Sequence, residues 1–134
     1  MNGFLLDTNV PSELTRPRSD PKVERWLEDA DDEQLFFSVV SLGEILKGVT
    51  ILPESRRREE LQQWLDDTSR PWFSGRILPV TERIAGRRQL IGKTITVPDG
   101  FIAATALHHD LTIVTRNVKD FEDLGVPVLN PWES

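Results

Sequence analysis

The chain has 134 residues, of which 38% are hydrophobic and 28% are charged, so we expect one soluble globular domain spanning residues 1–134. It has no cysteine and only two histidines, His108 and His109, which excludes disulfides, cysteine-ligated zinc and a metal site built from several histidines. The net charge of −6 argues against a protein that coats nucleic acid by bulk electrostatics, but it leaves room for a nuclease with an acidic site.

The N-terminal third predicts two buried strands and two helices. Phe4–Leu6 is an apolar run that ends at Asp7, which predicts a buried first strand, and a short helix begins at Asn9. Pro21–Ala30 predicts a second helix, and Leu35–Ser38 predicts a second strand. The first residues lack a secretory signal and no apolar run could cross a bilayer, so we expect a cytoplasmic protein without a membrane partner.

Two helices are predicted next. The first is indicated by apolar residues at i, i+3, i+4 and i+7, and Pro53 ends it. The second covers 54–68 and is strongly charged with a narrow apolar face. The apolar positions of the two helices are Leu42, Ile45, Leu46 and Val49, and then Leu61, Trp64 and Leu65.

The second half of the chain continues the alternation of strands and helices. In chain order we expect a strand at 76–80, a helix from Thr81 towards Gly92, a helix opened by Pro98 and Asp99, a strand at 111–115, a helical turn at 119–124 and a strand at 126–129. Such alternation predicts an α/β fold, with a parallel central sheet of about five strands between helical layers.

Several acidic and amide residues fall where the predicted strands end. Asp7 ends the first strand, and Asn117 and Asp120 follow the fourth. Glu44 is expected in the first turn of the helix after the second strand, and Asp99 in the first turn of the helix before the fourth. Because ligands of parallel sheets bind at the carboxyl ends of the strands, we expect these residues to converge on one edge.

Crowded carboxylates repel one another unless a cation neutralises them. Oxygen-only ligands suit Mg²⁺ or Mn²⁺, which keep some waters and accept phosphate oxygens. Two such ions about 3.5–4 Å apart can activate a water and stabilise a leaving oxygen. The pattern therefore predicts metal-dependent cleavage of a phosphodiester bond without a nucleophilic side chain.

Each acid also has an ordinary structural explanation. Asp7 suits a turn after a strand, and Asp120 suits a surface or the start of a helix. Ser41 and Glu44 match a capping box, and Asp99 suits the positive end of a helix dipole. The metal site is favoured because all four structural explanations would otherwise have to coincide at one sheet edge.

Five segments in order resemble the motifs of PIN-domain nucleases. They are Phe4–Asn9, with D-T-N after an apolar strand; Ser38–Ile45, with a hydroxyl residue three positions before a glutamate; Val97–Ala106, an aspartate opening an alanine-rich helix; Val114–Phe121; and Gly125–Trp132. The resemblance spans essentially the whole chain and is strongest to VapC-type toxins of bacterial toxin–antitoxin modules.

This resemblance implies a three-layer α/β/α fold, a metal-dependent endoribonuclease, a homodimer and inhibition by a cognate antitoxin. It implies that Asp7, Glu44 and Asp99 bind the first Mg²⁺, and that Asp120, with Asn117, places a second ion or the attacking water. Many PIN domains have an aspartate where this chain has Asn117, so the fourth ligand is the position at which the chain departs from the pattern. The surrounding residues expected to hold carboxylates, waters or substrate are Thr8, Asn9, Ser41, Thr115 and Arg116.

Other charged and aromatic residues carry weaker predictions. The basic pairs and runs at 16–18, 56–58 and 87–88 are expected on solvated surfaces, or in contact with RNA phosphates or an acidic partner. His108 and His109 are expected at a helix end. The tryptophans are expected in the core or at interfaces, and the apolar stripes from Trp26 to Trp64 could form a groove for an antitoxin helix.

Three other functions remain open from the residues alone. A magnesium-dependent phosphatase or phospho-acceptor domain would use Asp7 as nucleophile, but no second acid follows two residues later, and neither Lys93 nor Lys119 is placed convincingly to grip phosphate. A non-catalytic binding subunit would have no reason to keep repelling acids. Cleavage of DNA instead of RNA is compatible with the same metal chemistry.

Overall fold

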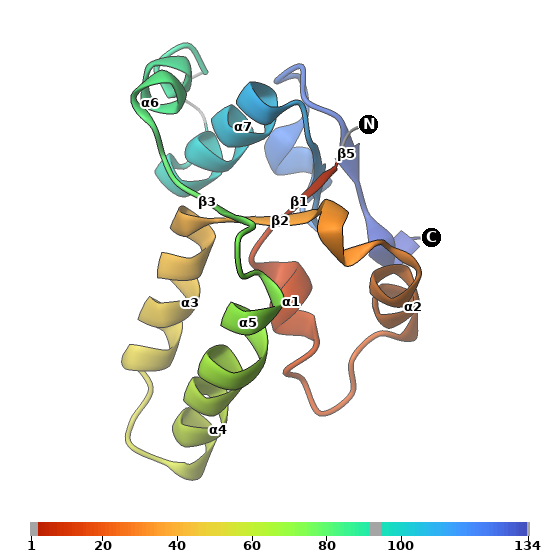
Figure 1. Ribbon diagram of the computed structural model, residues 1–134, viewed down its shortest axis with the longest axis vertical. Coiled ribbons are helices and arrows are strands. Elements are labelled where there is room, and N and C mark those ends of the chain that lie inside the picture. The colour runs from red at the N-terminus through yellow and green to blue at the C-terminus, as the bar shows by residue number, and fades with distance from the viewer. Residues whose placement is uncertain (1–2, 92–94, 134) are drawn as a thin grey trace.

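The computed structural model describes residues 3–91 and 95–133 and contains a five-stranded, entirely parallel sheet (Figure 1). The strand order is β3-β2-β1-β4-β5. The strands are β1 (Phe4–Leu6), β2 (Leu35–Ser38), β3 (Ile77–Leu78), β4 (Thr112–Val114) and β5 (Val128–Leu129). The chain therefore builds outward from β1 to one side and then returns to build the other side, which leaves a topological switch point between β1 and β4.

Alternating apolar residues cover both faces of the sheet. Leu5 and Ile113 point into one core, whereas Leu6, Phe37 and Val114 point into the other, and all five are fully buried. Strands buried on both faces must be apolar throughout, which explains why β1 and β2 read as continuous hydrophobic runs.

Helices cover each face, so the molecule has the expected three-layer α/β/α architecture (Figure 1). Helix α7 (Val97–His109) lies on the face of Leu5, and α6 (Glu82–Arg88) packs on α7. The other face is covered mainly by α1 (Asn9–Glu13), α2 (Pro21–Asp29), α3 (Val39–Thr50), α4 (Arg56–Trp64), the π-helical turn Leu65–Ser69 and α5 (Arg70–Trp72). Short 3-10 turns complete the chain at Asp32–Gln34, Val118–Phe121 and Pro131–Glu133.

Side-chain caps fix where the main helices begin. Asp20 accepts a hydrogen bond from the backbone N–H of Lys22, 2.9 Å away, with Pro21 at the first helical position. The hydroxyls of Ser38, Thr81 and Thr96 cap α3, α6 and α7 in the same way. These caps agree with the expected helix starts at Pro21 and after Thr81.

Several element boundaries differ from the sequence predictions. The strands expected at 111–115 and 126–129 are shorter, Thr112–Val114 and Val128–Leu129. The helix expected at 54–68 starts at Arg56 and passes through a π-helical turn, which brings both Leu65 and Ser69 into the interior, before ending at Trp72. The strand expected at 76–80 has only two residues, because Pro79 has no N–H for a sheet ladder. Helix α6 ends at Arg88 and residues 89–91 form a turn and a bend, so the helix is shorter than expected; Gly92 itself lies outside the described residues. The turn expected at 119–124 covers 118–121.

Within residues 3–91 and 95–133, none of the helices combines the length and the apolar character that a membrane span requires.

Candidate functional site

Asp7 lies at the topological switch point, directly after β1, and its side chain is only 6% exposed. Its backbone N–H donates to the carbonyl of Val114 at 2.9 Å, which ties the end of β1 to the end of β4. Its carboxylate accepts hydrogen bonds from the Thr8 N–H at 2.8 Å, the Thr115 hydroxyl at 2.8 Å and the Asn9 amide at 3.4 Å. This carboxylate is therefore buried and held in one orientation.

Thr115, directly after β4, connects three residues of the site. Besides donating to Asp7, its hydroxyl oxygen accepts from the Asn117 N–H at 3.0 Å and from the Asn9 side-chain amide at 3.3 Å. The side-chain oxygen Oδ1 of Asn9 in turn accepts a hydrogen bond from the Arg116 backbone N–H at 3.4 Å. The two strand ends are thus joined by side-chain hydrogen bonds that orient Asp7.

Glu44 reaches the same edge of the sheet from α3. The Thr8 hydroxyl donates to its Oε1 at 3.1 Å, across a separation of 36 residues. Glu44 is the sixth residue of α3, so it stands in the second turn of that helix and not in the first turn as expected. The capping explanation for Ser41 and Glu44 is wrong, because the helix starts earlier and Ser38 caps it. The Ser41 hydroxyl is buried and has no hydrogen-bond partner among the described residues.

Asp99 stands in the first turn of α7, as expected, and is partly buried. Its backbone N–H donates to the capping Thr96 hydroxyl at 3.3 Å. Asp120 is exposed in the 3-10 turn after β4, and its backbone N–H donates to the carbonyl of Asn117 at 3.1 Å.

Electrostatics link these four acids to one another. Burial raises the pKa of Asp7 above its ordinary value, the bonds from Thr115 and Thr8 oppose that rise, and the charges of Asp99 and Glu44 add to it. Burial also raises the pKa of Asp99, against the Thr96 hydrogen bond, and the charge of Asp120 adds to that rise. The acids predicted from four separate segments therefore lie close enough to repel one another.

The donor set of this site suits a hard divalent cation. All its charged atoms are carboxylate oxygens, and a cation would relieve the repulsion that raises the pKa of Asp7 and Asp99. In the described part of the chain, no three His, Cys, Asp or Glu side chains are arranged to hold a metal ion by themselves. Water and substrate oxygens would have to complete the coordination, as Mg²⁺ usually requires.

A cavity of about 530 Å³ adjoins this acidic edge, and its lining carries both signs of charge: Arg116 and Lys119 stand beside the acids Asp120, Glu122 and Glu133. Its lining includes Arg116, Asn117, Lys119 and Asp120. The guanidinium of Arg116 lies 5.5 Å from the ring centre of Trp132, and no carboxylate of the described residues forms an ion pair with it. Arg116 is therefore fixed by an aromatic ring and keeps its hydrogen-bond donors for another group.

Two residues behind Arg116 were not assigned to the site from the sequence. Asn130 accepts from the Trp132 N–H at 2.9 Å and donates to the Arg116 carbonyl at 3.5 Å. Trp132 is buried, as expected of a core anchor, but it also supports Arg116. The signal that could have identified them is the final Asn130-Pro131-Trp132 segment, which returns the chain to the end of β4.

Comparison with known proteins gives consistent results. The model of the PIN domain family matches residues 4–127. The toxin FitB of Neisseria gonorrhoeae is 38% identical over 96% of this chain and 98% of its own length, and a crystal structure of FitAcB from that organism superposes with a TM-score of 0.91 over 98% of this chain and 99% of that one.

Two more distant relatives extend the comparison. The VapC ribonuclease Y4jK of Sinorhizobium fredii is 34% identical over 97% of this chain and 98% of its own length. A toxin–antitoxin complex from Klebsiella pneumoniae contains a chain that is 27% identical, with a TM-score of 0.73 over 96% of this chain and 98% of that one.

Proposed function

Because the chain belongs to the PIN domain family, we propose that it is a metal-dependent endoribonuclease and the toxin of a toxin–antitoxin module. The observation that carries this proposal is the convergence of Asp7, Glu44, Asp99 and Asp120 at the switch point of the sheet, where the Thr8 hydroxyl beside Asp7 binds Glu44, the charge of Asp99 acts on Asp7 and that of Asp120 acts on Asp99. The names of two relatives, a toxin and a ribonuclease, support it. We expect the protein to act on RNA in the cytoplasm.

We assign the carboxylates to a Mg²⁺ or Mn²⁺ site. Asp7, Glu44 and Asp99 would hold the first ion, and Asp120, with the Asn117 amide, would hold a second ion or the attacking water. When bound, such ions supply a water activated for attack and neutralise charge on the cleaved phosphate. Thr115, Thr8 and Asn9 orient Asp7 and Glu44 by the hydrogen bonds described above.

We assign Arg116 the role of binding the substrate phosphate next to the cleaved bond. Its guanidinium has no carboxylate partner in residues 3–91 and 95–133, and it shares a cavity with Asp120. A guanidinium binds a phosphate through two parallel hydrogen bonds, so stacking on Trp132 would prepare it for that contact.

The function is tested with purified, antitoxin-free protein and structured RNA, with Mg²⁺, with Mn²⁺ and with EDTA. We expect cleavage that needs the metal and falls by at least about 100-fold in Asp7→Ala and in Asp99→Ala. Asp67→Ala, an exposed acid on the π-helical turn, is the matched control and should cleave like the wild type. Metal-dependent cleavage that survives in Asp7→Ala would refute the assignment.

The relatives do not favour a phosphatase or phospho-acceptor function, and one measurement distinguishes that function from a nuclease. A phospho-acceptor aspartate would bind beryllofluoride in the presence of Mg²⁺. We expect no such binding at Asp7, whose two carboxylate oxygens already accept hydrogen bonds from Thr8, Asn9 and Thr115.

The antitoxin is assigned to a groove that begins at the acidic edge. An apolar cavity of about 340 Å³ runs from Thr8 and Glu44 along α3 to Leu61 and Trp64 of α4. A helix with apolar residues on one face would fit such a groove and reach the acids. Of the two tryptophans that bounded the groove in the sequence prediction, Trp64 lines this cavity. Trp26 does not line it, because its ring packs against that of Phe4, with the ring centres 5.1 Å apart.

We propose a homodimer through the two ends of α3 and the start of α7, on a surface that adjoins the antitoxin groove and shares Glu44 and Gly48 with it. Three large apolar side chains there are unusually exposed: Val39 at 43%, Ile51 at 72% and Val97 at 63%. Gly43 and Gly48 lie beside Ile51 in one shallow cavity of about 430 Å³, so the surface permits close approach. Contiguous exposed apolar surface marks a protein interface, which a second copy would cover.

A further inference from the structure

Helix α6 carries positive charge that the proposed active site does not use. Three of its seven residues are arginines, Arg83, Arg87 and Arg88, in a chain whose net charge is −6. No carboxylate of the described residues forms an ion pair with any of them. In an acidic chain, arginines left without acidic partners indicate a surface for an external anion.

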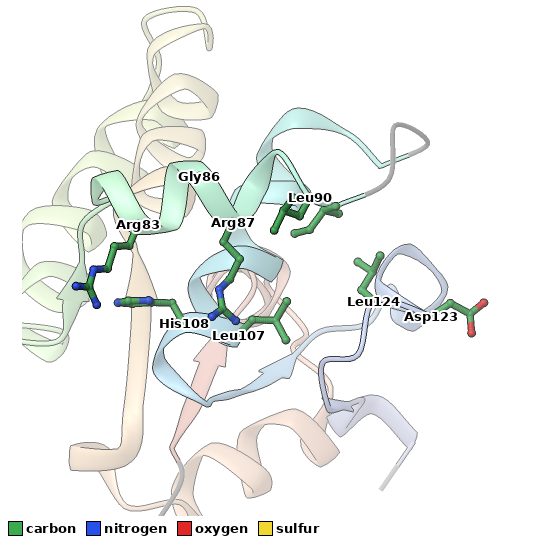
Figure 2. A pocket seen from close by; sticks show the side chains of 9 residues that line it. Arg83, Gly86, Arg87, Leu90, Leu107, His108, Asp123 and Leu124 are labelled. Carbon is green, nitrogen blue, oxygen red and sulfur yellow. The ribbon is translucent and has the colours of Figure 1, made fainter.

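Two of these arginines line a cavity of about 660 Å³ where α6 lies over the last turn of α7 (Figure 2). The Arg83 guanidinium lies beside the His108 ring, and Arg87 extends towards Leu107. The carboxylate of Asp123, the one acid of the lining, points away from both arginines (Figure 2). The positive charge of the cavity is therefore not cancelled by its own wall.

The rest of the lining is apolar. Leu90 is 87% exposed, which is costly unless something covers it, and Ile91, Leu107 and Leu124 complete this wall. A ligand for this cavity should therefore combine anionic groups with flat or apolar ones. Nucleotides have both, as phosphates and base faces, and the volume lies in the range of ordinary ligand sites.

Arg88 connects this cavity to the acidic edge. Its guanidinium lies against Gly100, so closely that a Cβ at that position would overlap it, and it stands 5.8 Å from the ring centre of Phe101. Gly100 follows Asp99 in the chain. Helix α6 thus presents positive charge from the last turn of α7 to its first turn, where the proposed site begins.

We propose that the α6–α7 cavity is an exosite for the RNA substrate: Arg83 and Arg87 bind backbone phosphates of a segment away from the cleaved bond. The proposal rests on the ribonuclease function proposed above. Asp99 and His108 are nine positions apart on α7, a rise of about 14 Å, so roughly four stacked nucleotides would span the two sites. An acidic peptide would offer similar charges, but RNA is favoured because one strand could engage both ends of the same helix.

The test compares Arg83→Glu/Arg87→Glu with a matched charge reversal on α2, Lys22→Glu/Arg25→Glu. All four side chains are exposed, and the described residues give none of the four an ion pair. Binding of a labelled single-stranded RNA of about 20 nucleotides is measured by fluorescence anisotropy in EDTA over a series of salt concentrations. Arg83→Gln/Arg87→Gln, which adds no negative charge, is the second variant in case the reversal disturbs folding.

We expect the α6 variants to bind RNA about three- to tenfold more weakly, with a salt slope reduced by about 1 to 1.5, and the α2 variant to differ less. In Mg²⁺, the KM for the long RNA should rise by a similar factor with kcat unchanged, while cleavage of a dinucleotide, which is too short to span the two sites, stays the same. Equal losses of RNA affinity in the α6 and α2 variants would overturn the exosite. So would α6 variants that bind RNA like the wild type, even if those variants had lost affinity for an acidic partner protein.

The binding assay contains no metal, so it separates the two proposals. RNA binding that depends on α6, without any metal-dependent cleavage, would support the exosite and refute the nuclease function. Cleavage that depends on Asp7 and Asp99 but not on α6 would support the nuclease function and refute the exosite.

Discussion

One hydroxyl, that of Thr115, links the Asp7 carboxylate to two neighbouring residues. Thr115 donates to it at 2.8 Å and also accepts bonds from Asn9 and Asn117, so removing this hydroxyl affects three neighbours. A buried carboxylate that loses a hydrogen bond is harder to ionise, which adds to the burial that already raises the pKa of Asp7.

Thr115→Val should therefore lower metal-dependent RNA cleavage by about 10- to 100-fold, the usual effect of losing a partner behind a metal ligand. Thr105→Val is the matched control, because Thr105 is also fully buried but donates only to the Phe101 carbonyl within α7. Equal activity of the two variants would show that the Thr115 hydroxyl does not orient the site.

Asp99 should make the metal-free protein less stable at neutral pH. Burial and the charge of Asp120 raise the pKa of Asp99 above its ordinary value of 3.8. A carboxyl whose pKa is raised by folding stabilises the fold when protonated, and this contribution is lost as the pH rises through the folded-state pKa.

We therefore expect Asp99→Asn to have a higher Tm than the wild type at neutral pH without metal, and the difference to vanish as the pH falls towards 4. Added Mg²⁺ should raise the Tm of the wild type by mass action and should raise that of the variant less. Differential scanning calorimetry over a pH series measures both. If the variant were less stable than the wild type at neutral pH, the charge of Asp99 would not be what destabilises the metal-free fold.

At the scale of elements, α6 and α7 fit together because residue 100 has no side chain. The Arg88 guanidinium occupies the place of a Cβ, and its Nε is buried without a partner among the described residues. The contact is therefore made by close packing and not by a hydrogen bond. A side chain at position 100 would force the flexible end of Arg88 to move.

Gly100→Ala should destabilise the fold by about 1 to 3 kcal/mol, because the added methyl displaces Arg88. Adding Arg88→Ala should cost less in the Gly100→Ala background than in the wild type, and the double-mutant cycle in urea denaturation measures that coupling. Gly86→Ala in α6 is the control: its Cβ meets nothing within 4 Å, so the helix should gain about 0.5 to 1 kcal/mol. Additive costs at positions 88 and 100 would show that the close approach has no energetic effect.

At the scale of the whole molecule, two acidic edges would be brought together if the α3–α7 face is the dimer interface. Glu44 in α3, Ile51 directly after it and Pro98 beside Asp99 all line the same shallow cavity. The interface proposed for the second copy is thus continuous with the proposed active site.

Ile51→Glu should convert the dimer to a monomer, since a charge would be buried without a partner in the interface. Size-exclusion chromatography with light scattering measures the mass in solution. Leu90→Glu, at an exposed apolar position in the α6–α7 cavity, should keep the dimer. A wild-type protein that is already monomeric, or an Ile51→Glu variant that stays dimeric, would refute this interface.

Local chemistry made most of the fold predictable from the sequence. Apolar runs, the 3.6-residue stripe of Ile45 and Val49, and proline positions specify strands and helices over a few residues, and their alternation specifies a parallel sheet. The same local order indicated Asp7, Glu44, Asp99 and Asp120, because acids at strand ends and helix starts of an α/β fold meet at one edge.

What only the tertiary structure decided depends on contacts between distant segments. Three features require burial and distances that no short pattern contains: the start of α3 at Val39 under its Ser38 cap, the hydrogen bond of Glu44 with Thr8, and the support of Arg116 by Trp132. The cavity between α6 and α7 is a further case, because it exists only where the two helices pack and leave Arg83 and Arg87 without acidic partners in the described chain. The sequence by itself determined which residue types stand at the sheet edge, and packing determined which of them touch, since hydrogen bonds and electrostatic repulsion depend on distance in space.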